Sequence, residues 1–389
     1  MVVQGHAEGG AGRMNVLIRV DASFEIGTGH VMRCLVLAEA LREKGGYCRF
    51  VCRTHPGHLI DRIRQRGFEV HVLPHRAGWQ PTENTPVHIA WLGADWITDA
   101  EETKVGAGET APDWLIVDHY AIDARWENAL RASARRILVI DDLADRPHDC
   151  DLLLDQNWFG DATPRRYPGL VPEGCRLFLG PRYALLHPDY AAWRKKLRER
   201  DGAVRRVLVF MGGGDPGNLT AKALLALSSD EFDSLEIEVV LGPNHPDPAG
   251  IAELAARRAN TRVVRDLPSL AAPMAWADLM IGGGGTVTWE RMCLGLPAIV
   301  ISLAANQTPI QRTLAEEGLV FFLGRQDQVE AEHIAAALRN CLAKPGLLRA
   351  MSAKAMQMTE GAGSEIVSRY LHGERVGDVG ERDVASAPC

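Results

Sequence analysis

The stretch that decides the fold is Arg19-Val-Asp-Ala-Ser-Phe-Glu-Ile-Gly-Thr-Gly-His-Val-Met-Arg33. The run before it, residues 15–20, is short and apolar, which predicts the first buried strand of a parallel sheet. After it, apolar side chains recur at helical spacing until Gly45-Gly46 ends the pattern. The predicted order is therefore strand, glycine loop and helix.

His30 is the first candidate catalytic residue. It falls in the first turn of the predicted helix, at the carboxyl end of a strand, where open α/β sheets place their ligands. The positive end of the helix dipole disfavours a protonated imidazole there, which suits a general base near neutral pH. Gly27 and Gly29 let the backbone turn tightly and approach a bound molecule. A histidine that only caps or packs fits this stretch equally well.

Length and composition narrow the class of protein. The chain has 389 residues, which predicts two domains with sizeable cores. Its formal net charge of -7 gives no electrostatic reason to expect nucleic acid or an anionic membrane as a partner. The apolar runs all fall short of the ~20 residues of a membrane span. The eight cysteines are scattered without paired CxxC spacing, which is typical of reduced thiols in a cytoplasm.

Apolar runs alternate with helical patterns along the chain, which predicts βαβ units and parallel sheets with both faces covered. Strands are predicted at 15–20, 47–52, 69–73, 114–117, 136–140, 152–154 and 176–179, and in a second series at 205–210, 236–241, 261–264, 278–281, 297–301 and 319–322. Two such series imply two doubly wound, Rossmann-like α/β domains facing each other across a cleft. We assign residues 14–187 to the first domain and 188–372 to the second. The Gly-rich residues 1–13 and the polar residues 373–389 are predicted to be disordered.

Acidic residues follow several predicted strands of the first domain. Asp21 comes after the first strand, Asp118-His119-Tyr120 after the fourth, and Asp141-Asp142 after the fifth. Because the carboxyl ends of parallel strands meet at one edge, these groups should surround one crevice together with His30. A carboxylate there can orient an imidazole, and Tyr120 can hydrogen-bond a sugar or phosphate. Helix N-capping explains an aspartate after a strand equally well.

Two glycine loops in the second domain each follow a predicted strand and open a helix. They are Met211-Gly-Gly-Gly-Asp-Pro-Gly-Asn218 and Ile281-Gly-Gly-Gly-Gly-Thr-Val-Thr-Trp-Glu290. Free backbone N–H groups and a positive helix end make each loop a candidate anion cradle. Neither loop matches the P-loop or the GxGxxG spacing of dinucleotide sites. One loop alone is consistent with a tight turn, but two on neighbouring strands that face a cleft indicate a diphosphate.

Polar residues beyond these loops extend the predicted nucleotide site. Glu290 lies about one turn into a helix, where a carboxylate can accept hydrogen bonds from a ribose diol. Asn306-Gln307 ends another strand and offers neutral donors and acceptors to a sugar. Since no conspicuous set of magnesium-binding carboxylates stands beside the loops, we expect a nucleotide diphosphate neutralised by backbone groups, with no metal. Packing is favoured over a role as stacking platforms for three tryptophans in or beside the longest connection of the first domain: Trp79, Trp91 and Trp96.

Together these motifs resemble a known family. The order of Arg265-Asp266-Leu267, Gly282-Gly-Gly-Gly-Thr286, Glu290, Gly295-Leu-Pro297 and Asn306-Gln307 is similar to the UDP-binding half of GT-B nucleotide-sugar enzymes, including the bacterial cell-wall N-acetylglucosaminyltransferase. A closer resemblance is to the UDP-2,4-diacetamido-2,4,6-trideoxy-β-L-altropyranose hydrolases of pseudaminic acid biosynthesis. It rests on Arg19-x-Asp21-x-Ser23, Gly27-x-Gly-His30-x-x-Arg33, Asp118-His-Tyr120, Asp141-Asp142, Tyr183-Ala-Leu-Leu186 and Met211-Gly-Gly-x-Asp-x-x-Asn218.

The resemblance implies a GT-B fold and a cytoplasmic hydrolase of flagellin glycosylation that cleaves a UDP-sugar at its anomeric carbon with inversion. His30 would be the general base on water, and no cofactor or metal is implied. The implied substrate-binding residues are Asp21, Gly29, Tyr120, Asn157, His187, Asn306 and Gln307, and the implied UDP-binding residues are Gly213, Gly214, Asn218, Gly284, Gly285, Thr286 and Glu290. The family often has arginine where His187 stands, so a charge available to the pyrophosphate is weaker here.

Other classes of protein compete with this interpretation. A GT-B glycosyltransferase would use the same UDP site with a sugar or lipid acceptor in place of water, and would favour a basic amphipathic patch that the first domain does not clearly offer. A silent UDP-sugar-binding protein would not need the grouping of Asp21, His30 and Tyr120. A nicotinamide-dependent enzyme is disfavoured because the first loop lacks the GxGxxG register. The balanced composition favours a monomer.

Overall fold

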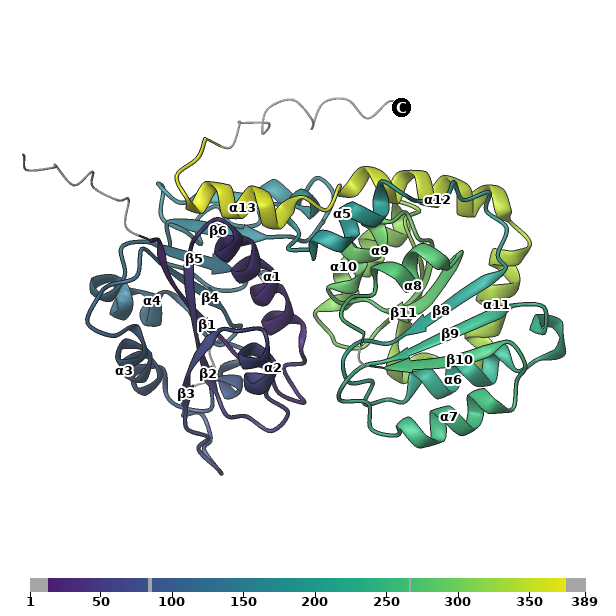
Figure 1. The fold of residues 1–389 in the computed structure, drawn as a ribbon, viewed down its shortest axis with the longest axis horizontal. Coiled ribbons are helices and arrows are strands. Elements are labelled where there is room, and N and C mark those ends of the chain that lie inside the picture. Colours follow the sequence, from purple (N-terminus) through teal and green to yellow (C-terminus); the bar gives the residue numbers. More distant parts are fainter. Residues whose placement is uncertain (1–12, 83–85, 266, 376–389) are drawn as a thin grey trace, which may run out of the picture.

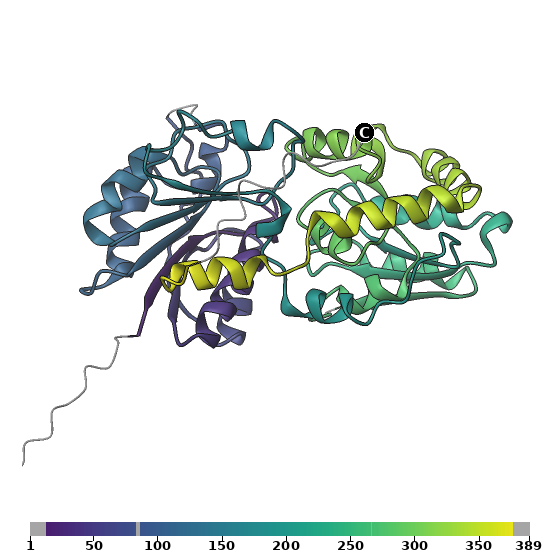
Figure 2. The same ribbon diagram turned by 90° about the horizontal axis from the view of Figure 1, so that it is seen from above.

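The computed structural model describes residues 13–82, 86–265 and 267–375, which form two α/β domains side by side (Figures 1 and 2). Most of the extension predicted at 1–13 and of the tail predicted at 373–389 lies outside the described residues. Each domain is a parallel sheet with helices on both faces. The predicted fold class, two doubly wound parallel-sheet domains, is confirmed.

The first domain is built on a sheet whose order, among the described residues, is β3-β2-β1-β4-β5-β6-β7. Its strands are β1 (Asn15–Val20), β2 (Tyr47–Arg53), β3 (Glu69–Leu73), β4 (Trp114–Asp118), β5 (Ile137–Ile140), β6 (Leu152–Asp155) and β7 (Arg176–Leu179). Its α-helices are α1 (Gly29–Glu43), α2 (Ile60–Gln65), α3 (Trp96–Ala107) and α4 (Ala124–Leu130). The strand order reverses between β1 and β4, which is the position where open α/β sheets form a ligand crevice.

The second domain repeats this plan with the order β10-β9-β8-β11-β12-β13. Its strands are β8 (Arg206–Phe210), β9 (Glu236–Leu241), β10 (Thr261–Arg265), β11 (Leu279–Gly283), β12 (Ala298–Ser302) and β13 (Phe321–Arg325). Its helices are α5 (Pro188–Arg194), α6 (Leu219–Leu227), α7 (Pro248–Ala256), α8 (Ala271–Trp276), α9 (Val287–Cys293), α10 (Gln307–Glu316), α11 (Ala331–Leu342) and α12 (Pro345–Met358). The order reverses between β8 and β11, and the two glycine loops follow these two strands.

Side-chain alternation along β1 explains how the first sheet is buried on both faces. Val16, Ile18 and Val20 pack with α1 in one core, whereas Leu17 packs in the core on the opposite face. Successive residues of a strand point to opposite faces, so an unbroken apolar run buries both. The second domain follows the same pattern, since Val207 and Leu208 of β8 lie in different cores.

The last described helix, α13 (Gly363–Leu371), departs from the predicted domain limits. Residues 188–372 were assigned to the second domain, but Val367 and Leu371 are buried in the core of the first domain. Ser368 Oγ donates to the carbonyl of Ala40, 3.2 Å away in α1. Figure 2 shows the chain passing from α12 on the second domain to α13 on the first. The chain therefore crosses between the domains twice. Along the described residues, no helix combines the length and apolar character that a membrane crossing requires.

Candidate active site

A cleft of about 890 Å³ lies between the two domains, at the carboxyl edges of both sheets. Most of the predicted site residues line it together: Gly29, His30, Tyr120, Asn157, His187, Gly213, Gly214, Gly284, Gly285, Thr286, Glu290, Asn306 and Gln307. Asp21 and Asn218 are not among the residues of its wall. Two doubly wound sheets that face each other thus bring groups separated by up to 278 positions to one crevice.

His30 is held by Asp118, the last residue of β4. Its Nδ1 lies 2.6 Å from Asp118 Oδ1. Burial alone would raise the pKa of Asp118, but the Arg33 guanidinium and His30 beside it hold that pKa well below its usual range. An ionised carboxylate only accepts hydrogen bonds, so Nδ1 carries the proton. The lone pair of the neutral imidazole is then on Nε2, which is the form a general base needs.

Arg33 completes this buried group. Its Nε and Nη2 each donate to Asp118 at 2.6 Å, and its Nη1 donates to Asp142 Oδ2 at 3.1 Å. Arg33 Nη2 also lies 3.3 Å from His30 Nδ1, but its shorter contact is with the carboxylate. The two-point contact between Arg33 and Asp118 fixes the carboxylate plane, and through it the orientation of the imidazole. An aspartate near the imidazole was predicted, and the structure identifies it as Asp118.

Asp21 was predicted to bind substrate, and the structure places it elsewhere. Its side chain is fully buried, 2.8 Å from Arg19 Nη1, and it accepts a hydrogen bond from the backbone N–H of Arg53 at 2.6 Å. Its Oδ2 is also 3.3 Å from His119 Nε2 and 3.5 Å from His55 Nε2. Asp21 therefore joins the ends of β1 and β2 beneath the cleft and does not reach the substrate space.

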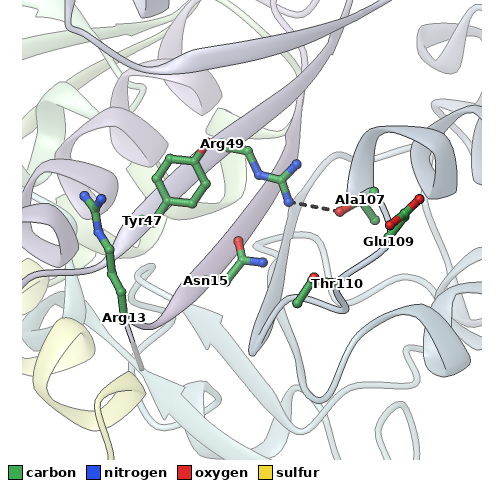
Figure 3. Close-up of a pocket in the computed structure, with 8 residues that line it drawn as sticks. Arg13, Asn15, Tyr47, Arg49, Ala107, Glu109 and Thr110 are labelled. Carbon is green, nitrogen blue, oxygen red and sulfur yellow. Dashed lines mark hydrogen bonds between the residues drawn. The ribbon is translucent and has the colours of Figure 1, made fainter. Parts of the chain in front are cut away.

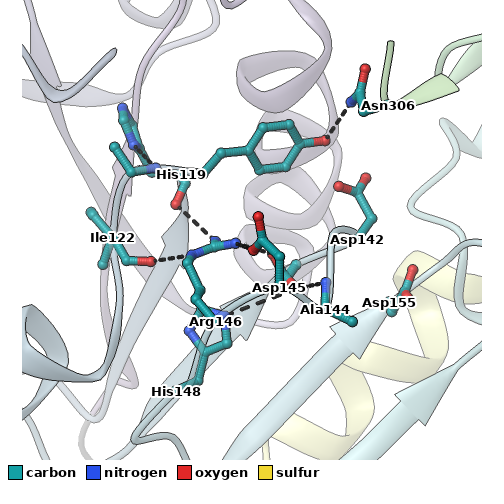
Figure 4. A network of polar contacts seen from close by, with 12 residues as sticks. His119, Ile122, Asp142, Ala144, Asp145, Arg146, His148, Asp155 and Asn306 are labelled. Carbon is teal, nitrogen blue, oxygen red and sulfur yellow. Dashed lines mark hydrogen bonds and ion pairs between the residues drawn. The ribbon is translucent and has the colours of Figure 1, made fainter. Parts of the chain in front are cut away.

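Tyr120 connects the base to the second domain. Its ring stands edge-on to the His30 imidazole, with the centroids 4.6 Å apart. Asn306 Nδ2 donates to Tyr120 Oη at 3.4 Å across the cleft, and Figure 4 draws this bond at the labelled Asn306. Burial and the neighbouring Asp142 carboxylate raise the pKa of Tyr120 well above its usual value, so the hydroxyl keeps its proton.

A buried network around Arg146 joins the segment that carries Tyr120 to the segment that follows β5 (Figure 4). Arg146 donates through Nε to the carbonyl of Ile122 and through Nη2 to that of His119. Its Nη1 pairs with Asp141 Oδ1 at 2.9 Å. The backbone that presents Tyr120 is therefore cross-linked from beneath, which keeps the ring in place.

Trp91 is a cleft residue that the sequence analysis assigned to packing. It lies in a short 3₁₀ helix, η1 (Ile89–Leu92), and its ring stacks on Tyr120 with centroids 5.6 Å apart. His88 lies 4.4 Å from Trp91, and both line the cleft. Trp91 and Trp96 both pack against the core of the first domain, as predicted, and Trp91 lines the cleft as well. A His-x-x-Trp spacing is that of an ordinary buried helix face, so the sequence carried no signal for this position.

The glycine loops lie against the loop that carries His30. A Cβ at Gly213 would come within 2.4 Å of Thr28 Oγ1 and a Cβ at Gly29 within 3.4 Å of Thr286 Cγ2. Only glycine at position 213 allows the first loop of the second domain to approach the first domain this closely. The predicted base and the predicted phosphate cradle therefore share one space.

Asn218 was predicted to bind UDP, but it lies outside the cleft wall. It precedes α6 in the left-handed conformation with φ of 47°. The neighbouring Asp215 accepts hydrogen bonds from the backbone N–H groups of Leu219 and Thr220, at 2.8 Å each, and so caps the helix. The Asp-x-x-Asn part of this motif shapes the start of α6, while the glycines before it face the cleft.

Glu290 lines the cleft from α9. Burial raises its pKa to about 7, and a hydrogen bond with Tyr190 of α5 partly offsets this. Hydrogen-bond donors favour the ionised form of a carboxyl group, so hydroxyl groups that bind Glu290 would lower its pKa and complete its ionisation. This behaviour suits recognition of a ribose diol.

Asn157 and His187 already have protein partners. Asn157 Oδ1 accepts a hydrogen bond from Trp289 Nε1 at 3.2 Å. His187 Nδ1 accepts one from the backbone N–H of Asp189 at 3.3 Å and so caps α5. Both side chains line the cleft, but one polar atom of each already forms a hydrogen bond within the protein. Similarly, Gln307 Oε1 accepts from the backbone of Leu303.

Comparison with known proteins finds a matching family model and several relatives. Residues 207–365 match the glycosyltransferase family 28 C-terminal domain. The UDP-2,4-diacetamido-2,4,6-trideoxy-β-L-altropyranose hydrolase of Campylobacter jejuni is 28% identical over 306 residues, which cover 78% of this chain and 97% of the relative. The spore coat polysaccharide biosynthesis protein SpsG of Bacillus subtilis is 24% identical over 82% of this chain and 86% of its own.

Solved structures agree on the architecture. MurG of Acinetobacter baumannii superposes with a TM-score of 0.61 over 92% of this chain and 99% of its own, at 16% identity. LpCGTa, solved in complex with UDP, superposes with a TM-score of 0.62 at 14% identity, over 92% and 99%. The chain has the GT-B fold. The family resemblance seen in the sequence motifs is confirmed by these matches.

The GT-B chain also has a second cavity, which is unrelated to the predicted site. It has a volume of about 610 Å³ and lies at the amino ends of β1 and β2, the opposite edge of the sheet (Figure 3). Arg13 and Arg49 stand over the ring of Tyr47 there. None of the predicted site residues lines this cavity.

Proposed function

We propose that this chain hydrolyses a UDP-sugar at the anomeric C–O bond, with inversion, and releases UDP and the free sugar. The substrate is UDP-2,4-diacetamido-2,4,6-trideoxy-β-L-altropyranose, as the name of the Campylobacter relative states for that protein. The observation that carries the proposal is His30, which lies in the wall of a cleft that also holds two glycine loops and is paired with the buried Asp118 behind it. A base and an anion cradle are the two parts that hydrolysis with a diphosphate leaving group requires.

The chemistry follows from the order of these groups along the cleft. The oxygen of a water molecule attacks the anomeric carbon while His30 Nε2 takes its proton. The bond from that carbon to the β-phosphate oxygen breaks, and its electron pair leaves with UDP. Attack opposite the leaving group inverts the configuration. Asp118 stabilises the imidazolium that forms, because it stays ionised and lies 2.6 Å from Nδ1.

The second domain would hold the nucleotide. The backbone N–H groups of the loops at 212–214 and 283–286, which line the cleft, would donate to the diphosphate and neutralise its charge without a metal. Glu290 accepts hydrogen bonds from the ribose diol. Tyr120 and Asn306, which are linked across the cleft, contact the sugar between the base and the diphosphate. We further propose a cytoplasmic monomer, since one chain supplies both walls of the cleft and the cysteines that the structure describes are free.

The test is incubation of the purified protein with this UDP-sugar in water, without acceptor or metal, followed by NMR of UDP and of the anomeric proton. We expect stoichiometric free sugar of inverted configuration. His30→Ala should bind UDP as before and release no sugar. Full activity in His30→Ala would reject the assignment of the base.

A UDP-sugar-dependent glycosyltransferase is the second candidate, because the solved structures that share this fold include named glycosyltransferases. It would use the same residues, with an acceptor hydroxyl in place of water at His30. The same NMR assay separates the two functions: a transferase would bind the UDP-sugar and release UDP only after an acceptor is added.

A further inference from the structure

The segment before α3 places two aromatic rings in the cleft through buried anchors. In η1, Ile89 and Leu92 are buried, and Leu92 belongs to the core of the first domain. Gly93 follows with φ of +69°, and a Cβ there would lie 2.7 Å from His55 Cε1. A left-handed turn in so little space requires glycine. His88 precedes Ile89, and Trp91 lies between Ile89 and Leu92, so packed neighbours hold both rings in place.

These two rings continue the surface that begins at the base. His30 contacts the edge of Tyr120, Trp91 stacks on Tyr120 with an interplanar angle of 24°, and His88 lies 5.4 Å from Tyr120. All four side chains line the cleft. An aromatic wall, defined here as His88, Trp91 and Tyr120, therefore extends from the reacting centre along the first domain. The glycine loops and Glu290 belong to the other domain.

The wall has few charges of its own. Burial lowers the pKa of His88, so its imidazole is neutral near pH 7. Tyr120 keeps its proton, and its hydroxyl is engaged by Asn306. The side chain of Val87, 76% exposed, lines the same part of the cleft. Aromatic faces and an aliphatic side chain favour methyl and C–H groups over hydroxyls, because hydroxyls placed there would lose water without a replacement partner.

We propose that His88 and Trp91 determine sugar specificity, by binding the methyl groups of an N-acetylated, 6-deoxy pyranose. This inference rests on the proposed function, since it places the sugar of a UDP-sugar beside His30. One methyl group in a fitted apolar pocket is worth about 10- to 200-fold in discrimination. The wall therefore selects deoxy, acetamido sugars over hexoses with a hydroxyl at each position.

The experiment measures equilibrium binding by calorimetry, in the His30→Ala protein so that no ligand is consumed. The probes are UDP, UDP-glucose, UDP-N-acetylglucosamine and UDP-2-acetamido-2,6-dideoxyglucose. We expect affinity to rise along the three sugars by about tenfold or more in total. Adding Trp91→Ala should remove most of this rise and leave the Kd for UDP within twofold. Trp91→Phe should keep part of it, and His88→Ala should weaken the acetamido step.

Trp79→Ala is the matched control, because Trp79 lies in the same connection and is not part of the cleft wall. It should preserve the order of affinities. If Trp91→Ala leaves the preference intact, or weakens UDP and every sugar by the same factor, the proposal is wrong. Thermal melting of each variant separates misfolding from lost contacts, and Trp91→Phe remains informative if the alanine variant does not fold. If the sugar preference depends on Trp91 but the unmodified protein does not hydrolyse the UDP-sugar, the proposed function is wrong and the role of Trp91 in specificity stands.

Discussion

Replacement of Asp118 by asparagine tests the central electrostatic claim about the base. The side chain keeps its size, but the carboxylate that faces His30 Nδ1 at 2.6 Å is lost. When His30 takes a proton from water, the new positive charge is then no longer balanced. Two unit charges about 4 Å apart at an effective dielectric constant of about 20 interact by about 4 kcal/mol. The turnover number should therefore fall by about a thousandfold.

The same change also affects stability. Arg33 donates to Asp118 through Nε and Nη2, and only its Nη1 contact with Asp142 would remain charged. Removing one partner of a buried ion pair typically costs about 3–5 kcal/mol. Urea unfolding should show a loss at the lower end of this range, since Asp142 still compensates part of the charge.

The assay is single-turnover release of UDP from the UDP-sugar, with UDP binding measured in parallel. UDP affinity should not change, because Asp118 belongs to the first domain and the glycine loops to the second. Cys34→Ala is the matched control, since the Cys34 thiol donates only weakly to the same carboxylate at 3.4 Å. It should alter turnover by less than about tenfold. A folded Asp118→Asn protein whose turnover also stays within tenfold of the original would refute the reasoning.

Three further outcomes follow from buried charges. Because burial raises the pKa of Glu290 to about 7, UDP-sugar affinity should increase about tenfold from pH 6 to pH 8, and calorimetry on Glu290→Gln should find no such slope. Burial also raises the pKa of Asp155 from 3.8 to about 7, so the folded state keeps a proton that the unfolded chain releases above pH 4. Stability should therefore fall as pH rises from 4 to 7, by up to about 4 kcal/mol, and urea titrations of Asp155→Asn should show a flatter profile. Arg291 is fully buried, its three side-chain nitrogens find no hydrogen-bond partner among the residues that the structure describes, and burial lowers its pKa to about 9. Arg291→Met should raise the free energy of unfolding by about 1–4 kcal/mol, and an unchanged or lower value would contradict this account of an uncompensated charge.

Local patterns in the sequence were sufficient to predict the strands and the position of His30 at the ligand edge of the first sheet. Apolar runs locate parallel strands because both faces are buried, and a glycine loop between strand and helix locates the ligand edge. The predicted strands at 15–20, 69–73, 176–179 and 236–241 match β1, β3, β7 and β9. These features depend only on residues close together in the chain.

The choice between Asp21 and Asp118 depended on strand pairing. Val20 of β1 pairs with Asp118 of β4, so Asp118 faces the same side of the sheet as Val20, toward α1 and His30. Asp21, one residue after Val20, alternates to the other side, where it meets Arg19. The sequence shows which residues of a strand share a face of the sheet. Which residue of β4 pairs with which residue of β1 depends on tertiary contacts.

The position of Trp91 in the cleft and the packing of α13 on the first domain could not be predicted from the sequence, for a different reason. An amphipathic helix shows that one face is buried without showing against which domain, and α13 packs on residues more than 300 positions earlier. A tryptophan in a long connection usually packs against a core, as Trp91 does, and only the position of Tyr120 shows that its ring also lines the cleft.

The return of α13 to the first domain has a consequence for synthesis of the protein. The core of that domain includes Val367 and Leu371, and the indole of Trp114 donates to the carbonyl of Leu371 at 3.1 Å. A ribosome adds about 5–20 residues per second, so roughly 10–40 s separate the end of the first sheet from the arrival of its last helix. During that time the nascent first domain exposes the apolar surface of α1 on which α13 will pack. α13 covers this surface only after the whole second domain has emerged from the ribosome.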